Sequence, residues 1–192
     1  MAIRRLLLVL FLLRFYFPAR SQSAGQYAVL IDEFLADPAP SAGLPSSSFI
    51  ELKNVSGFSV NLHNWKIGTG SSTATIKTEY LLGADSFLIL CPSSAEAAYR
   101  PFGPVLGITG FPSLNHDAGE IVLSSGEGAV IHAVQYDKSW YHNELKSDGG
   151  WTLEMIDLKN PCSGFSNWTA SSGANGGTPG KPNSVEAENP DQ

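Results

Sequence analysis

The stretch FIELKNVSGFSVNLHNWKI, residues 49–67, decides the fold. In its first half, Ile50 and Leu52 alternate with Glu51 and Lys53, which is the period of a strand with one buried face. A turn rich in asparagine, serine and glycine then breaks the alternation. The second half returns a tryptophan and two aliphatic side chains to the core. A tryptophan in a short strand is a large apolar anchor, suited to the middle of a two-sheet sandwich.

The composition favours a β-rich domain. The chain has 192 residues, 43% of them hydrophobic and 16% charged, with 19 Gly and 12 Pro, so one domain plus appendages is expected. Residues 93–100 form the one convincing helical pattern, and residues 102–117 and 137–150 are predicted as long loops. Further strands are predicted at residues 27–35, 73–76, 80–82, 86–91, 120–124, 129–136 and 151–156. Short strands at this spacing predict an all-β sandwich with one short helix in a loop.

Residues 1–21 have the organisation of a secretory signal peptide. Arg4 and Arg5 form a basic start, residues 6–13 form an unbroken apolar run, and small residues precede Gln22, where cleavage is expected. The alternative, an uncleaved membrane anchor, needs an apolar run of about 20 residues, and this run is shorter. The protein is therefore predicted to be secreted to a periplasmic, cell-surface or extracellular location, with no membrane span after cleavage.

Export would leave a strongly acidic protein with two cysteines. The formal net charge is −6, and loss of the four signal-peptide arginines leaves 8 basic against 18 acidic residues. Because no basic stripe is present, nucleic-acid binding is not expected. Cys91 and Cys162 are predicted to form one disulfide, since an even pair in an oxidising compartment usually joins. Two buried free thiols are the alternative.

Residues 49–56 and 62–67, with the pattern FIELKNxS followed by LxxWxI, resemble the core signature of the lamin tail domain. The resemblance is closest to the bacterial, secreted branch of that family, covers residues 27–185, and leaves residues 186–192 as a polar tail predicted to be disordered. The later segments YLLGADSFLI at 80–89 and GEIVL at 119–123 follow in the family's order. Features similar to those of the bacterial copies are IDEFLADP at 31–38, GGWTLE at 149–154, NPC at 160–162, NW at 167–168 and GGTPGKPNSV at 176–185.

The resemblance implies an immunoglobulin-like β-sandwich that serves as a binding or scaffolding module. The predicted function is therefore an exported, non-catalytic module whose partner is a protein or a cell-surface polymer. No nucleophile elbow, Walker motif or dinucleotide-binding glycine pattern occurs, so neither an enzyme activity nor an organic cofactor is expected. The alternative is an accessory or remnant domain of a secreted hydrolase, a phosphoesterase, nuclease or glycosidase, with Glu51 and Glu154 as active carboxylates.

Acidic residues of the predicted strands raise the question of a metal. If these strands are neighbours, Asp32, Glu33 and Glu51 meet at one edge and supply the oxygen ligands that Ca²⁺ prefers. The alternative is that Glu51 and Glu154 are the solvent-facing halves of alternating strands. The histidines show no metal-ligand spacing on one element.

Aromatic side chains in the two long loops are the other binding candidates. Phe102 and Phe111 lie in the first loop, and Trp140 and Tyr141 lie in the second. Exposed aromatics on loops can form a patch that binds protein or carbohydrate. Alternatively, they fold back as lids over the ends of the sandwich.

Overall fold

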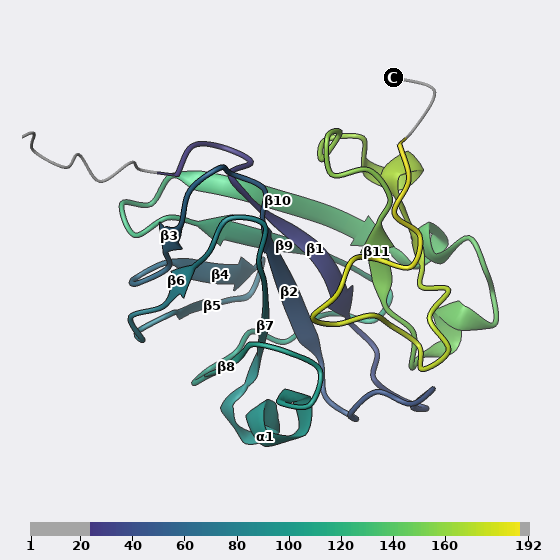
Figure 1. Cartoon of the computed structure of the whole chain (residues 1–192). Helices are drawn as coiled ribbons and strands as arrows, with labels where there is room; N and C mark the ends of the chain where they lie inside the picture. Colours follow the sequence, from purple (N-terminus) through teal and green to yellow (C-terminus); the bar gives the residue numbers. More distant parts are fainter. Residues whose placement is uncertain (1–23, 189–192) are drawn as a thin grey trace, which may run out of the picture.

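In a computed structural model, which describes residues 24–188, the chain forms a sandwich of two main sheets (Figure 1). The larger sheet has the strand order β12-β11-β1-β2-β7-β8. Neighbouring strands are antiparallel except β7 and β8, which are parallel. The strands are β1 (Val29–Leu35), β2 (Phe49–Asn54), β7 (Phe87–Pro92), β8 (Val105–Ile108), β11 (Leu153–Met155) and β12 (Trp168–Ala170).

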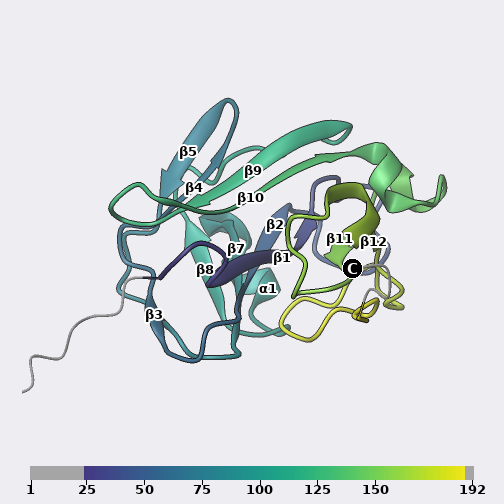
Figure 2. The ribbon, with the colours of Figure 1, turned by 90° about the horizontal axis from the view of Figure 1, so that it is seen from above.

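The smaller main sheet is antiparallel, with the order β10-β9-β4-β5. Seen from above, β4, β5, β9 and β10 lie along one side of β1 and β2 (Figure 2). The strands of this smaller sheet are β4 (Lys66–Thr69), β5 (Ser72–Thr75), β9 (Ala118–Ser124) and β10 (Val130–Asp137). A separate two-stranded sheet consists of β3 (Val60–Asn61) and β6 (Leu81–Leu82).

The core between the sheets is apolar and aromatic. Phe34 of β1 packs against Tyr136 of β10 and Trp168 of β12, with ring centroids 4.7 Å and 5.4 Å away. Trp65 and Ile67 of the fold-deciding stretch are buried in the same cluster. The predicted all-β sandwich with one short helix in a loop is therefore confirmed, and Trp168 returns to the core within a strand of its own.

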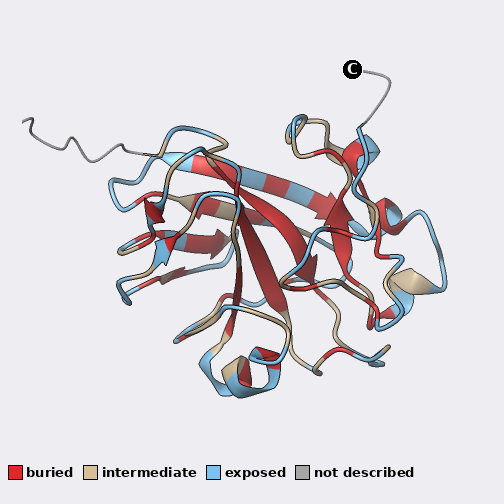
Figure 3. Cartoon of the chain, in the orientation of Figure 1, coloured by how far each residue is buried: buried red, intermediate tan, exposed pale blue. Residues whose placement is uncertain are grey.

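The strands β1 and β2 are buried on both faces (Figure 3). The face of the six-stranded sheet that points away from the smaller sheet, called the outer face below, holds a second apolar cluster that includes Phe49, Cys91 and Tyr99. The 3-10 helix η1 (Ser93–Ala95) and the helix α1 (Glu96–Tyr99) cover part of this face. The alternating pattern of β2 predicted one buried face, and the cover over the outer face accounts for the difference.

Several segments differ from the sequence-based expectation. The predicted loop 102–117 contains β8, which pairs with β7 after the helical crossover. The predicted loop 137–150 contains two 3-10 helices, η2 (Lys138–Tyr141) and η3 (Lys146–Asp148), and a third, η4 (Gly164–Asn167), precedes β12.

The two ends of the chain bear on the export and tail predictions. The predicted signal peptide, residues 1–21, lies outside the described residues. The predicted disordered tail begins too early, because the amides of Glu186 and Ala187 donate to the carbonyls of Asn183 and Ile156. Within residues 24–188, no helix is long and apolar enough to cross a membrane.

Candidate functional site

Three glutamates on adjacent strands meet on the outer face of the six-stranded sheet. Glu33 of β1 is the register partner of Glu154 on β11 and of Glu51 on β2. Ile50 and Leu52 point into the core between the sheets, so the alternation of β2 places Glu51 on the opposite face. All three glutamates have 0% exposure. The interpretation of Glu51 and Glu154 as solvent-facing residues is therefore wrong.

The C-terminal strap, defined here as residues 178–187, covers these carboxylates. Glu33 Oε1 accepts from the amide of Thr178 at 2.8 Å and from the hydroxyl of Thr152 at 2.7 Å. Glu51 Oε2 accepts from the amide of Gly180. Glu154 accepts from the hydroxyls of Thr178 and Ser184, at 2.8 Å and 2.7 Å.

The strap continues from a segment that passes very close to the sheet. A Cβ on Gly177 would lie 2.7 Å from Glu33 Oε1 and 2.8 Å from a methyl carbon of Thr152. At Gly180, where φ is +80°, a Cβ would lie 2.3 Å from the carbonyl oxygen of Phe102. Gly180 therefore requires glycine, and a side chain at Gly177 would have to displace Glu33 and Thr152. The GGTPG sequence thus allows the backbone to reach the buried carboxylates.

Burial makes these acids hard to ionise. Burial is the main cause that raises the pKa of Asp32 to about 7 and the pKa of Glu33 to about 8. The pKa of Glu51 is raised well above its usual value, first by burial and then by the neighbouring charges of Glu33 and Asp32. Within residues 24–188, none of the four carboxylates, Glu154 included, forms an ion pair with a basic side chain.

The predicted calcium ligands are brought together without forming a recognisable metal cage. Asp32 Oδ1 accepts from the side-chain amide of Asn183 at 3.1 Å, and one oxygen each of Glu33 and Glu51 accepts from the strap. Glu33 Oε2 and Glu51 Oε1 are buried without a hydrogen-bond partner. Among the described residues, no group of three or more His, Cys, Asp or Glu side chains is arranged to hold a metal ion. Calcium binding stays a prediction without support from this geometry.

The predicted disulfide is absent from the structure. Cys91 is a buried free thiol in the outer-face cluster with Phe49 and Tyr99. Cys162 is an exposed free thiol, and its Sγ lies 2.8 Å from the hydroxyl oxygen of Tyr27. The sequence supplied an even number of cysteines but no geometry, and the fold places the two thiols against different partners.

We expect one fast-reacting thiol in the native protein. Burial raises the pKa of Cys91 to about 11 from a usual 9.0, which lowers its thiolate fraction by about 100-fold. A thiol reagent at pH 8 should therefore label Cys162 rapidly and Cys91 only after unfolding. The Cys162→Ser variant should lose the fast phase and Cys91→Ser should keep it. Linked Cys91 and Cys162 peptides in a non-reducing digest would contradict this prediction.

The aromatic loop residues do not form an exposed patch. Trp140 is 8% exposed and Tyr141 4% exposed, and the Trp140 ring lies 6.4 Å from that of Trp168. Phe102 and Phe111 are half-buried against the two apolar clusters. The binding-patch prediction is therefore wrong, and the alternative, in which these residues act as lids over the sandwich, describes their positions.

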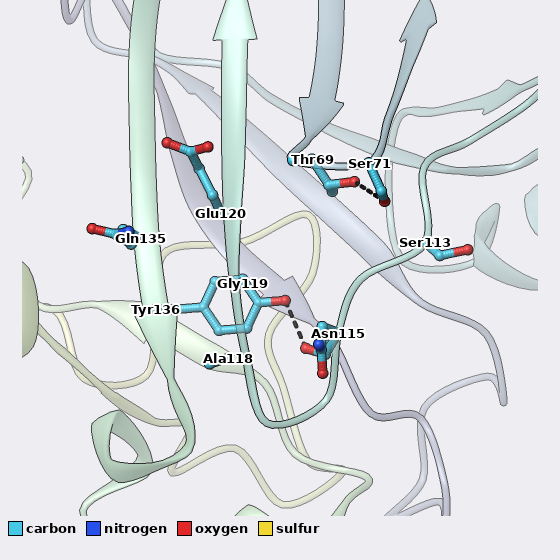
Figure 4. A pocket seen from close by; sticks show the side chains of 10 residues that line it. Thr69, Ser71, Ser113, Asn115, Ala118, Gly119, Glu120, Gln135 and Tyr136 are labelled. Carbon is cyan, nitrogen blue, oxygen red and sulfur yellow. Dashed lines mark hydrogen bonds between the residues drawn. The ribbon is translucent and has the colours of Figure 1, made fainter.

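An open polar cleft lies beside β9, where sequence reasoning found no chemistry (Figure 4). Its volume is about 480 Å³. The strand β9 begins at Ala118, but its pairing with β4 begins only at Val122, so the first part of β9 borders the cleft. The lining side chains are mainly hydroxyl and amide groups from β4, the β4–β5 turn, β9, β10 and the loop before β9: Thr69, Ser71, Ser113, Asn115, Glu120, Gln135 and Tyr136.

Two hydrogen bonds shape the ends of this cleft. The Tyr136 hydroxyl donates to the carbonyl of Asn115 at 2.7 Å, which holds the loop before β9 against β10. The hydroxyls of Thr69 and Ser71 lie 3.4 Å apart in the turn between β4 and β5. Sequence reasoning missed these residues because isolated Ser, Thr, Asn and Gln in turns have no periodic or motif signal of their own.

Neither models of known protein families nor curated proteins match this chain. The resemblance to the lamin tail domain therefore rests on the quoted motifs and their order along the chain.

Proposed function

We propose that this chain is an exported, non-catalytic module of the lamin-tail type that binds a protein or a cell-surface polymer. The observation that carries the proposal is the polar cleft beside β9, which is open while the acidic cluster is covered. Hydroxyl and amide groups suit the recognition of peptide backbones and sugar hydroxyls, because each can donate and accept hydrogen bonds. Export is the expectation from the predicted signal peptide.

The cleft lacks the paired acids of a hydrolase. Among residues 24–188, Glu120 is the single carboxylate that lines it, and two-carboxylate mechanisms need both an acid and a base or nucleophile. The residues proposed for the hydrolase alternative, Glu51 and Glu154, have 0% exposure and hydrogen bond to the strap. A raised pKa, as at Glu51, is typical of a general acid, but no substrate reaches a carboxylate in this position while the strap is closed.

The test compares binding and turnover with the same purified chain. On arrays of extended peptides and envelope polysaccharides, we expect at least one ligand to bind. The Ser71→Trp variant, in which the indole fills the cleft, should weaken this binding at least about tenfold, which is about 1.4 kcal/mol of binding free energy. The control Glu144→Trp places the same bulk on an exposed loop and should leave binding unchanged. With phosphodiester and glycoside substrates we expect no turnover. Turnover that Glu51→Gln abolishes would favour the hydrolase and overturn the proposal.

A further inference from the structure

The first half of β9 has a neighbouring strand on one side only. Its register with β10 begins at Ala118, whereas its register with β4 begins only at Val122. At Thr69, β4 turns back to pair with β5 and leaves β9. Within residues 24–188, no strand therefore pairs with residues 118–120 on the β4 side, and these residues are called the open edge below.

The ladder between β9 and β10 shows where the main-chain groups of the open edge point. In an antiparallel pair, residues that bond to one neighbouring strand alternate with residues whose N–H and C=O point to the other side. The amide of Lys138 donates to the carbonyl of Asp117 at 2.7 Å, so Asp117 and every second residue after it face β10. The N–H and C=O groups of Ala118 and Glu120 therefore point away from β10, to the side that β4 leaves.

The pairing between β4 and β5 gives the same assignment. The amide of Ile76 donates to the carbonyl of Trp65 at 2.8 Å, so the odd-numbered residues of β4 face β5 and the even-numbered ones face β9. Gly68 is the register partner of Val122, so the even-numbered residues of β9 face β4. Because each residue carries one main-chain donor and one acceptor, the open edge presents two donors and two acceptors.

The open edge borders the polar cleft, where a ligand can reach it. Ala118, Gly119 and Glu120 all line the cleft, whose volume of about 480 Å³ lies within the range of roughly 300–1,000 Å³ found for ligand sites. Figure 4 shows Ser71 of the β4–β5 turn and Asn115 of the loop before β9 on the side of β9 that faces away from β10. Among the described residues, Glu120 is the one charged side chain of the lining, so the cleft is acidic.

We infer that the cleft binds an extended segment of a partner polypeptide, which adds to the open edge of β9 as a short strand in the position that β4 leaves. This inference rests on the proposed function and names the partner group: a peptide main chain with a basic side chain beside Glu120. The main-chain hydrogen bonds of an added strand supply affinity, and an opposite charge across the strands stabilises the pair. A polysaccharide lacks the regular series of amide and carbonyl groups that matches a sheet edge, so the open edge favours a peptide.

The main-chain pairing is tested with a capped, fluorescently labelled hexapeptide in which lysine and threonine alternate. Two further peptides carry N-methyl groups on the lysine amides or on the threonine amides. In an added strand every second N–H faces β9, so one methylated peptide should bind at least about tenfold more weakly and the other should change less than about twofold. Fluorescence anisotropy with the purified chain measures the three affinities, and the side chains are the same in all three peptides.

The Ala118→Pro variant removes one donor of the open edge from the protein side. Ala118 is the first residue of β9, where a sheet tolerates proline, and its amide does not face β10. Binding of the unmethylated hexapeptide should weaken at least about fivefold. The matched control is Thr73→Pro in β5, because the amide of Thr73 points away from β4 and lies outside the cleft lining. This control should leave binding unchanged, and urea denaturation checks that both variants fold.

Three outcomes would overturn strand addition. They are no binding of the hexapeptide at millimolar concentration, equal affinities of the two methylated peptides, and unchanged binding by a folded Ala118→Pro variant. If that variant does not fold, the methylated peptides decide. These outcomes leave the proposed function standing where the arrays yield another ligand whose binding Ser71→Trp weakens. The proposed function itself fails if no ligand of the arrays is sensitive to Ser71→Trp.

Discussion

Replacing Gly150 with alanine is expected to lower the free energy of unfolding by about 3–5 kcal/mol. Gly150 has φ of +78°, and a Cβ there would lie 2.1 Å from the carbonyl oxygen of Pro40 and 2.7 Å from the amide nitrogen of Ala42. Both clashing atoms belong to the backbone, so no side-chain rotation relieves them. The Gly150 amide also donates to the carbonyl of Asp37 at 2.8 Å, which ties the two segments at this crossing.

A matched glycine separates the clash from the backbone strain. Gly128 has φ of +89°, but a Cβ there would meet no atom within 4 Å, so Gly128→Ala should cost only the left-handed strain, about 1–2 kcal/mol. The measurement is urea denaturation of both variants and the unmodified chain. Equal losses for the two variants would contradict the close crossing of residues 39–42 and 149–150.

Raising the pH from 6.5 to 8.0 is expected to lower the free energy of unfolding by at least about 2 kcal/mol, because Glu33 and Asp32 alone account for that much and the raised pKa of Glu51 acts in the same direction. Glu33 has a pKa of about 8 in the folded protein against a usual 4.5, and Asp32 a pKa of about 7 against 3.8. Between pH 6.5 and 8.0 the folded protein thus binds protons that the unfolded chain has released. This stability is fully present below the unfolded pKa values and is lost as the pH rises through the folded ones.

Between pH 6.5 and 8.0, the titrations of His132 and Cys91 contribute little to the change in stability. Burial lowers the pKa of His132 to about 4, so its contribution to stability grows with pH only up to its unfolded value near 6.5. The raised pKa of Cys91 contributes mainly above the upper limit. Denaturation curves at the two pH values, at constant ionic strength, measure the change.

Variants at one acid and at one exposed position show which groups carry the effect. Glu33→Gln removes one titrating group, so the fall between the two pH values should shrink by about 1.5 kcal/mol. Glu127→Gln should leave the fall as it is in the unmodified chain. Stability that stays constant, or that rises, between pH 6.5 and 8.0 would show that the buried carboxyl groups are ionised in the folded protein.

Local sequence patterns were sufficient for most of the strands. The apolar run of β7, the alternation in β2 and the turn formers between them depend on periodicity and backbone preference, which neighbouring residues in the chain determine. Pairing partners are different, because they depend on residues far away in sequence. β8 was missed because its four residues, with a glycine in their middle, form a strand only by pairing with β7.

By itself, the sequence determined that this protein is an all-β sandwich built around residues 49–67, because side-chain period and turn chemistry are local properties. Only the tertiary structure decided which polar groups are buried and which thiols can meet. Glu51 reads as the exposed half of an alternating strand, yet it is buried because a strap almost 130 residues later in the chain donates to it. Cys91 and Cys162 read as a pair, yet the packing of distant strands places one in the interior and leaves the other exposed.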